Sequence, residues 1–327
     1  MLKRISLTLL FIVLAFYFGA SWFFSNLILN PPQGDPIQRT EAMLKIAGPN
    51  AKPINNWLNI PDTFALEARD GKTIRGWYFK AKDEAECAVI MAHGWSSSRL
   101  HMNKYMPLFE DCPCDIITYD QRGHNKSETA YGTGGIKEAE DLLMIHNWLK
   151  DETGLKNEDI GWIGISWGGA TVLQAGATDE DVAFIVSDSP FQNWYSAVME
   201  RAVRDYGSWI TAFVPMIKTI VWARAGVNFD KASALKEAAK IKEPVFLIHS
   251  KADSATASTQ SVNIAAQLNP SSSEFHHTEW GNDHADDIKN NLAEYEVLFD
   301  AFIEKYAPNF STCQQASVDT ISNQVMN

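Results

Sequence analysis

The chain has 327 residues, of which 46% are hydrophobic and 21% are charged, a composition typical of a globular protein with one large core. Its formal net charge is −12 at pH 7 and it has no basic run, which excludes an electrostatic attraction to nucleic acid. We therefore expect no nucleic-acid partner, and one large domain with appendages at its ends.

An apolar run opens the chain. Lys3 and Arg4 precede uncharged residues from Ile5 to about Leu29, and about 20 helical residues are enough to cross the hydrocarbon core of a bilayer. We predict that residues 1–30 form a transmembrane anchor or signal segment that is not part of the fold. A cleaved signal peptide is the alternative, although its apolar region usually has only about 7–15 residues.

The charges beside this segment predict its orientation. No Lys or Arg follows Arg4 until Arg39. By the positive-inside rule, the N-terminus then lies in the cytoplasm, and a single helix anchors the domain on the non-cytoplasmic side of the membrane. If the signal is cleaved, the domain is exported instead. Residues 31–59, which contain Pro31, Pro32 and Pro36, are predicted to be a linker and lead-in.

Alternating strand and helix patterns predict an α/β domain over residues 60–306. Two strands surround the turn Asp70-Gly71, and later short apolar runs have the character of buried strands. The predicted strands are 63–66, 74–79, 87–92, 115–119, 160–165, 182–186, 245–248 and about 274–277, and the predicted helices are 135–150, 167–177, 256–268 and 285–306. This order predicts a mostly parallel central sheet with helices on both faces, and antiparallel strands at one edge.

Three features depart from this pattern. Residues 191–229 are rich in aromatic and aliphatic side chains, and they predict a helical cap that lines an apolar pocket, with ordinary packing helices as the alternative. Residues 307–327 are polar and are predicted to be a flexible tail. The four cysteines are expected to be free or buried thiols, because Cys112 and Cys114 are too close for an easy mutual disulfide and lack a zinc-site spacing; the other two are Cys87 and Cys313.

Residues 164–168 form a G-x-S-x-G motif around Ser166, between the strand 160–165 and the helix 167–177. This context is that of a nucleophile elbow, in which glycines permit a sharp turn between strand and helix. The turn lifts the serine hydroxyl above the sheet, at the positive end of the helix dipole. Ser166 is therefore the predicted nucleophile.

Two further loops resemble those of the α/β-hydrolase superfamily. His93-Gly94-Trp95 follows the strand 87–92, and residues 119–127 are similar to that superfamily's D-x-R-G-x-G-x-S loop, with Asn125 in place of the second glycine. The resemblance implies the α/β-hydrolase fold. It also implies that the backbone N–H groups of Trp95 and Trp167 form an oxyanion hole, while His93 fixes its loop.

The resemblance extends to the partners that a serine nucleophile needs. A base must activate the serine and an acid must orient the base, in the chain order Ser, Asp, His. Asp253 follows the strand 245–248 in a segment similar to the superfamily's H-G-x-x-D turn, with Ser250 in place of the glycine, and His284 lies in a loop before the last helix. Asp188 is the alternative acid. A metal site among His276, His277, Asp283 and Asp286 is a weaker alternative, because these residues lack a recognised spacing.

We therefore expect a serine hydrolase that cleaves carboxylic esters through an acyl-enzyme, of carboxylesterase or lipase type. The anchor and the aromatic cap favour a small-molecule or lipid-like ester with an apolar acyl group, near a membrane. A peptidase or thioesterase with the same triad is the alternative. A non-catalytic, membrane-tethered binding module is an alternative of another class. The resemblance implies no metal or organic cofactor.

Overall fold

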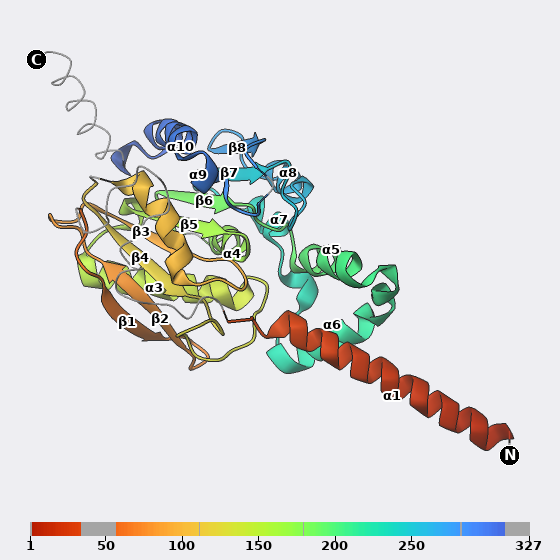
Figure 1. Cartoon of the computed structure of the whole chain (residues 1–327). Coiled ribbons are helices and arrows are strands. Elements are labelled where there is room, and N and C mark those ends of the chain that lie inside the picture. The colour runs from red at the N-terminus through yellow and green to blue at the C-terminus, as the bar shows by residue number, and fades with distance from the viewer. Residues whose placement is uncertain (1, 34–56, 111, 179, 282, 311–327) are drawn as a thin grey trace, which may run out of the picture.

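An eight-stranded sheet forms the centre of the protein (Figure 1). The computed structural model describes residues 2–33 and 57–310, apart from 111, 179 and 282. The strand order is β1-β2-β4-β3-β5-β6-β7-β8. The strands are β1 (Asp62–Glu67), β2 (Thr73–Phe79), β3 (Cys87–Ala92), β4 (Cys114–Asp120), β5 (Ile160–Ile165), β6 (Phe184–Asp188), β7 (Val245–Ser250) and β8 (Ser273–Thr278).

The sheet is antiparallel at one edge only. β1 pairs antiparallel with β2, and β2 pairs antiparallel with β4, whereas the remaining neighbours pair in parallel. Every residue of the five strands from β3 to β7 is buried. Parallel strands are covered on both faces, and this is why the sequence shows them as continuous apolar runs. The predicted fold class is confirmed.

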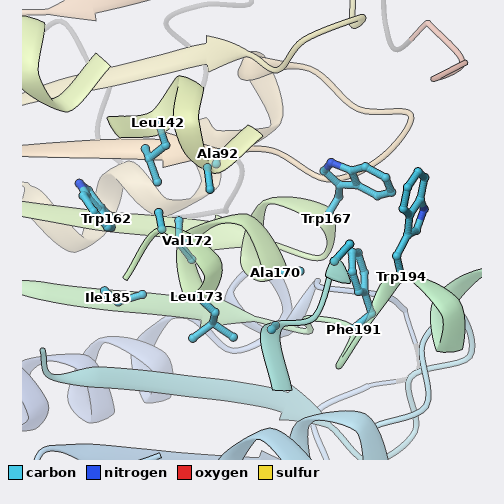
Figure 2. Packing of buried hydrophobic residues seen from close by; sticks show 14 of the residues in the cluster. Ala92, Leu142, Trp162, Trp167, Ala170, Val172, Leu173, Ile185, Phe191 and Trp194 are labelled. Carbon is cyan, nitrogen blue, oxygen red and sulfur yellow. The ribbon is translucent and has the colours of Figure 1, made fainter. Parts of the chain in front are cut away.

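Successive strand residues supply two hydrophobic clusters on opposite faces of the sheet, as the two-residue strand period requires. On β5, Trp162 joins the first cluster and Ile163 joins the second. The first cluster includes α3 (Ile136–Thr153), α4 (Trp167–Ala175) and Ile264 of α8 (Thr259–Ala265) (Figure 2). The second includes η2 (Arg99–Phe109), α9 (Asp287–Asn290) and α10 (Leu292–Tyr306).

The N-terminal helix α1 (Leu2–Leu29) projects away from the sheet, and the cap lies beside the part of it nearest the sheet (Figure 1). Its segment Leu7–Leu29 is long and apolar enough to span a membrane. The end of α1 is nevertheless part of the fold, because Leu29 and Phe24 are buried in the first hydrophobic cluster. The expectation that residues 1–30 stand apart from the fold is therefore wrong for the last two turns of the helix.

The cap segment contains α5 (Trp194–Tyr206), η4 (Ser208–Phe213), α6 (Val214–Ala225) and η5 (Phe229–Lys231), followed by α7 (Ala234–Ala238). α6 packs against α1, and Phe213 of η4 stacks on Tyr17 with ring centroids 5.2 Å apart. Most of the predicted linker, residues 34–56, lies outside the described residues.

Two helical segments near the C-terminus differ from the prediction. The helix predicted over 285–306 is divided into α9 and α10, which meet at Asn291. The tail predicted over 307–327 does not begin at 307, because Ala307 and Phe310 are buried in the second cluster. The rest of that predicted tail lies outside the described residues.

The cysteines also correct the prediction. Cys87 and Cys114 are directly paired on β3 and β4, with Cα atoms 4.5 Å apart, and they form a disulfide. Cys112 is disulfide-bonded as well. The expectation of free thiols is therefore wrong for these three residues, while Cys313 lies outside the described part of the chain. The pairing depends on β3 and β4 being neighbours in the sheet, which cysteine spacing alone does not show.

Candidate active site

Ser166 occupies a sharp turn between β5 and α4. Its backbone has φ 53° and ψ −112°, a left-handed conformation that L-residues adopt only under constraint. The turn needs its flanking glycines: a Cβ on Gly164 would lie 2.2 Å from the carbonyl oxygen of Gly168, and one on Gly168 would lie 2.0 Å from that of Ala92. The backbone of Ser166 is held in place because its N–H donates to the Asp188 carbonyl at 2.8 Å.

Three side chains from separate loops form a hydrogen-bonded line. His284 Nδ1 lies 2.6 Å from Asp253 Oδ2, and His284 Nε2 lies 2.7 Å from Ser166 Oγ. An ionised carboxylate can only accept, so Nδ1–H donates to Asp253 and the unprotonated Nε2 accepts from the serine hydroxyl. This geometry suits removal of the hydroxyl proton by His284.

The Asp253 carboxylate is fully buried and well satisfied. Its Oδ1 accepts from the N–H groups of Ala255 at 2.8 Å and Thr256 at 2.9 Å, and its Oδ2 also lies 3.1 Å from His249 Nε2. Burial alone would raise the pKa of Asp253, but the hydrogen bonds from His249 and His284 outweigh burial and hold that pKa well below its ordinary value. The carboxylate is therefore ionised at neutral pH.

Two residues that the sequence analysis gave no role organise these loops. His249 is buried, and its Nδ1 lies 2.7 Å from Ser261 Oγ on α8, so its ring ties the Asp253 loop to that helix. The Ser250 hydroxyl donates to the Gly281 carbonyl, which joins the Asp253 loop to the His284 loop. The sequence signal for His249 is its position four residues before Asp253. Its contacts with Ser261 and Asp253 depend on tertiary packing, which the sequence does not show.

Asp188, the alternative acid, faces a different set of partners. Its carboxylate accepts from Tyr105 Oη at 2.6 Å and from Ser189 Oγ at 2.8 Å, and it is fully buried. Asp253, and not Asp188, contacts His284. The alternative metal ligands are also dispersed: His277 Nε2 lies 3.0 Å from Ser258 Oγ, and no three His, Cys, Asp or Glu side chains in the described ranges are grouped to hold a metal.

The two predicted oxyanion-hole residues flank Ser166. Trp167 begins α4, so its N–H has no acceptor within the helix. Trp95 lies beside Ser166 along the same cavity, and its ring centroid is 4.5 Å from that of Trp167. The Trp95 loop is fixed by His93, whose Nε2 accepts from the Gln121 N–H at 3.0 Å and whose Nδ1 donates to the Gly94 carbonyl at 2.7 Å. Burial lowers the pKa of His93 to about 4, so this ring is neutral.

Ser166 and His284 lie between two cavities. The first, of about 650 Å³, is bounded by the cap and by the end of α1. Its floor is aromatic, because Trp167, Phe191 and Trp194 gather there (Figure 2). The second, of about 610 Å³, lies on the side of η2 and α9 and is lined by apolar residues such as Trp95 and Leu100 as well as by polar ones such as Asn103 and Lys104. An ester centred on Ser166 could thus place one part in each cavity.

Comparison with known proteins agrees with this architecture. Residues 115–213 match the family described as X-Pro dipeptidyl-peptidase (S15 family). The chain is 31% identical over 192 residues to the uncharacterized protein YqkD of Bacillus subtilis (strain 168), a match that covers 58% of this chain. It spans 62% of the length of YqkD, which is less than two thirds.

Solved structures share the fold. The Pyrococcus furiosus esterase Pf2001 superposes with a TM-score of 0.62 at 22% identity, over 85% of this chain and 99% of the esterase. The Pyrococcus horikoshii acylaminoacyl peptidase superposes with a TM-score of 0.56 at 22% identity, over 77% of this chain and 42% of the peptidase. The chain therefore has the α/β-hydrolase fold.

Proposed function

We propose that the protein is a serine hydrolase that cleaves carboxylic esters with apolar acyl groups. The observation that carries this proposal is the line Asp253–His284–Ser166, with its two short hydrogen bonds. A buried carboxylate, a correctly oriented imidazole and a serine on a strained turn are the parts that acyl transfer requires. Ser166 is the nucleophile, His284 the general base and Asp253 the residue that orients it.

In the proposed reaction, His284 Nε2 takes the proton of Ser166 while Oγ attacks the ester carbonyl. The N–H groups of Trp95 and Trp167 stabilise the oxyanion, and loss of one such donor typically costs about 10²–10³ in rate. His284 then protonates the departing alkoxide, which leaves as the alcohol. Water, deprotonated by His284, releases the acyl group from Ser166 as a carboxylic acid.

The two cavities support a substrate with one part on either side of Ser166. The aromatic floor formed by Trp167, Phe191 and Trp194 suits an acyl chain, because such side chains gain free energy by burying apolar surface. The second cavity, which is lined by both apolar and polar residues, has room for the alcohol part. A peptidase is the second candidate function, and the match of residues 115–213 to the X-Pro dipeptidyl-peptidase (S15 family) favours it.

We also propose that the domain lies on the non-cytoplasmic side of the membrane, anchored by α1. The placement of Lys3 and Arg4 before the apolar helix supports this orientation. The disulfide between Cys87 and Cys114 supports it independently, because disulfides persist mainly in oxidising compartments.

The nucleophile can be tested with a fluorophosphonate probe. We expect labelling of the wild type that disappears in Ser166→Ala, and a fall of several orders of magnitude in esterase activity in His284→Ala. Ser189→Ala is a matched control, because Ser189 also carries a positive φ but donates to Asp188. A folded wild type that does not react with the probe would support a binding module instead.

The substrate class can be tested with p-nitrophenyl esters of increasing acyl length, run beside thioesters and X-Pro dipeptide amides. We expect kcat/KM to rise with acyl length and the peptide amides to react far more slowly. Faster cleavage of the amides would favour the peptidase.

A further inference from the structure

The anchor helix forms part of the wall of the first cavity. Phe24, Leu27 and Ile28 of α1 line it together with Ser166 and His284. Ile210 of η4 and Val214 of α6, elements that pack against α1, line the same cavity. The space that leads to Ser166 is therefore enclosed partly by a helix that is apolar enough to cross a membrane.

The cap contacts a part of α1 that would lie within the hydrocarbon core if this helix crossed a membrane. If the span begins at Ile5, after Lys3 and Arg4, about 20 residues bring it to Phe24. Phe213 packs against Phe16 and Tyr17, and Tyr17 Oη donates to the Ala212 carbonyl at 3.0 Å. Tyr17 precedes Phe24 by two helical turns, about 10 Å along the axis. With this placement, the tip of the cap would lie about 10 Å inside the bilayer.

The composition of this tip fits that depth. Residues 206–217 contain no Asp, Glu, Lys or Arg. Trp209 is 54% exposed and Tyr206 is 43% exposed, and both rings lie beside Phe24, where the interface with water would be. Trp and Tyr are the residues that gather at such interfaces.

Two charged side chains of the cap, those of Arg224 and Lys218, have polar or charged partners. The Arg224 guanidinium hydrogen-bonds to Ser25 at 2.8 Å and to Asn26 at 2.6 Å, just past Phe24. Lys218, one turn into α6, directs its ammonium group to Asp230, 2.6 Å away. A long side chain that carries its charge back toward water is typical of a lysine near a membrane surface.

We propose that the tip of the cap, η4 and the start of α6, is immersed in the non-cytoplasmic leaflet of the membrane that α1 crosses. The acyl chain of a lipid ester then enters the first cavity sideways from that leaflet, between α1 and the cap. The second part rests on the proposed hydrolase activity, whereas the immersion rests only on the proposed anchoring of the domain by α1. The partner of this surface is the lipid bilayer itself, because the surface continues the apolar surface of α1.

Immersion of the cap can be measured without an assay of enzymatic activity. A nitroxide on Ala212→Cys, in full-length protein reconstituted into phosphatidylcholine and phosphatidylglycerol vesicles, reports collisions with oxygen and with a water-soluble nickel chelate. The matched control is Ala301→Cys, an equally exposed alanine on α10, on the far side of the molecule from α1 (Figure 1). We expect oxygen to dominate at 212 and nickel to dominate at 301. Collisions of the nickel chelate with the nitroxide at 212 would overturn the proposal. So would a nitroxide that neither reagent reaches, because residue 212 would then be buried in a contact with a second copy of the chain.

Lateral entry is tested by Ala212→Asp, with Ala301→Asp as its control. We expect hydrolysis of a long-chain ester embedded in vesicles to fall about tenfold in Ala212→Asp, while hydrolysis of p-nitrophenyl acetate stays within twofold. Equal effects on the two substrates would contradict lateral entry. A wild type that cleaves neither ester would refute the proposed function and leave the depth measurement valid.

Discussion

Asp253 and Asp188 show how environment assigns different roles to two buried carboxylates. Asp188 is satisfied by the hydroxyl groups of Tyr105 and Ser189, and it has no part in the hydrogen-bonded line to Ser166. Asp253 accepts from two backbone N–H groups and two histidines, so its negative charge is available to stabilise an imidazolium at His284. The residue type is the same, and the partners decide the chemistry.

This difference predicts the effect of removing each charge. We expect Asp253→Asn to lower kcat about 10³–10⁴-fold with little change in KM, because the amide does not stabilise the protonated His284. Asp188→Asn should keep at least a tenth of the activity. The measurement is kcat and KM for a p-nitrophenyl ester, with folding checked by circular dichroism. The opposite ranking of the two variants would make Asp188 the orienting acid.

The pH profile should follow from the same environment. Because its hydrogen bonds hold the pKa of Asp253 well below the ordinary value, this carboxylate stays ionised as the pH falls from 8 to 5. We therefore expect the fall of kcat/KM on the acid side to have a slope of one, because Asp253 adds no protonation of its own in this range. A slope of two, measured between pH 4.5 and 8, would show that a second group in the line also gains a proton.

At the scale of the elements, the disulfide between Cys87 and Cys114 joins β3 and β4, which are neighbours in the sheet. Cys87 and Cys114 begin β3 and β4, whereas the loop with Trp95 follows the other end of β3. We expect the double variant Cys87→Ala/Cys114→Ala to lose about 3.5 kcal/mol of stability, the chain-entropy value for a sequence separation of 27 residues. Denaturant unfolding measures this loss, and kcat should stay within twofold. Peptide mapping that finds both thiols free in protein from an oxidising compartment would contradict the pairing.

The elements that the sequence predicted well are those with a strong local pattern. The strands β3 to β7 are continuous apolar runs because they are buried, and all eight strands were predicted to within two residues at each end. The helical segment η2 was missed because it buries polar side chains such as Arg99 and Asn103, which hide its pattern. The loops with Ser166, Asp253 and His284 have local motifs, whereas the contacts of His249 and Ser250 form only when distant loops meet.

At the scale of the whole molecule, the end of the N-terminal helix α1 and the domain share one hydrophobic cluster. The end of α1 was predicted to stand apart because an apolar run before a linker gives no sign of what it packs against. In the structure, Leu29 is fully buried and its carbonyl accepts from the Gly132 N–H at 2.8 Å. α1 therefore positions the cap relative to the sheet.

Arg224 is the residue that joins these parts. Its guanidinium donates to Ser25, Asn26 and the Tyr131 hydroxyl, and it stacks on the rings of Trp22 and Tyr131. We expect Arg224→Gln to destabilise the docked helix by roughly 2 kcal/mol, because a charged hydrogen-bond donor and two cation–π contacts are lost.

The change should be local to the junction. Hydrogen exchange of the amides of residues 21–29 should speed up about tenfold or more in detergent-solubilised Arg224→Gln, while the amides of β5 keep their protection. Arg69→Gln, at an exposed arginine in the turn between β1 and β2, is the matched control and should leave residues 21–29 unchanged. Unchanged exchange at residues 21–29 in Arg224→Gln would mean that the buried apolar side chains Phe24 and Leu29 hold α1 in place without Arg224.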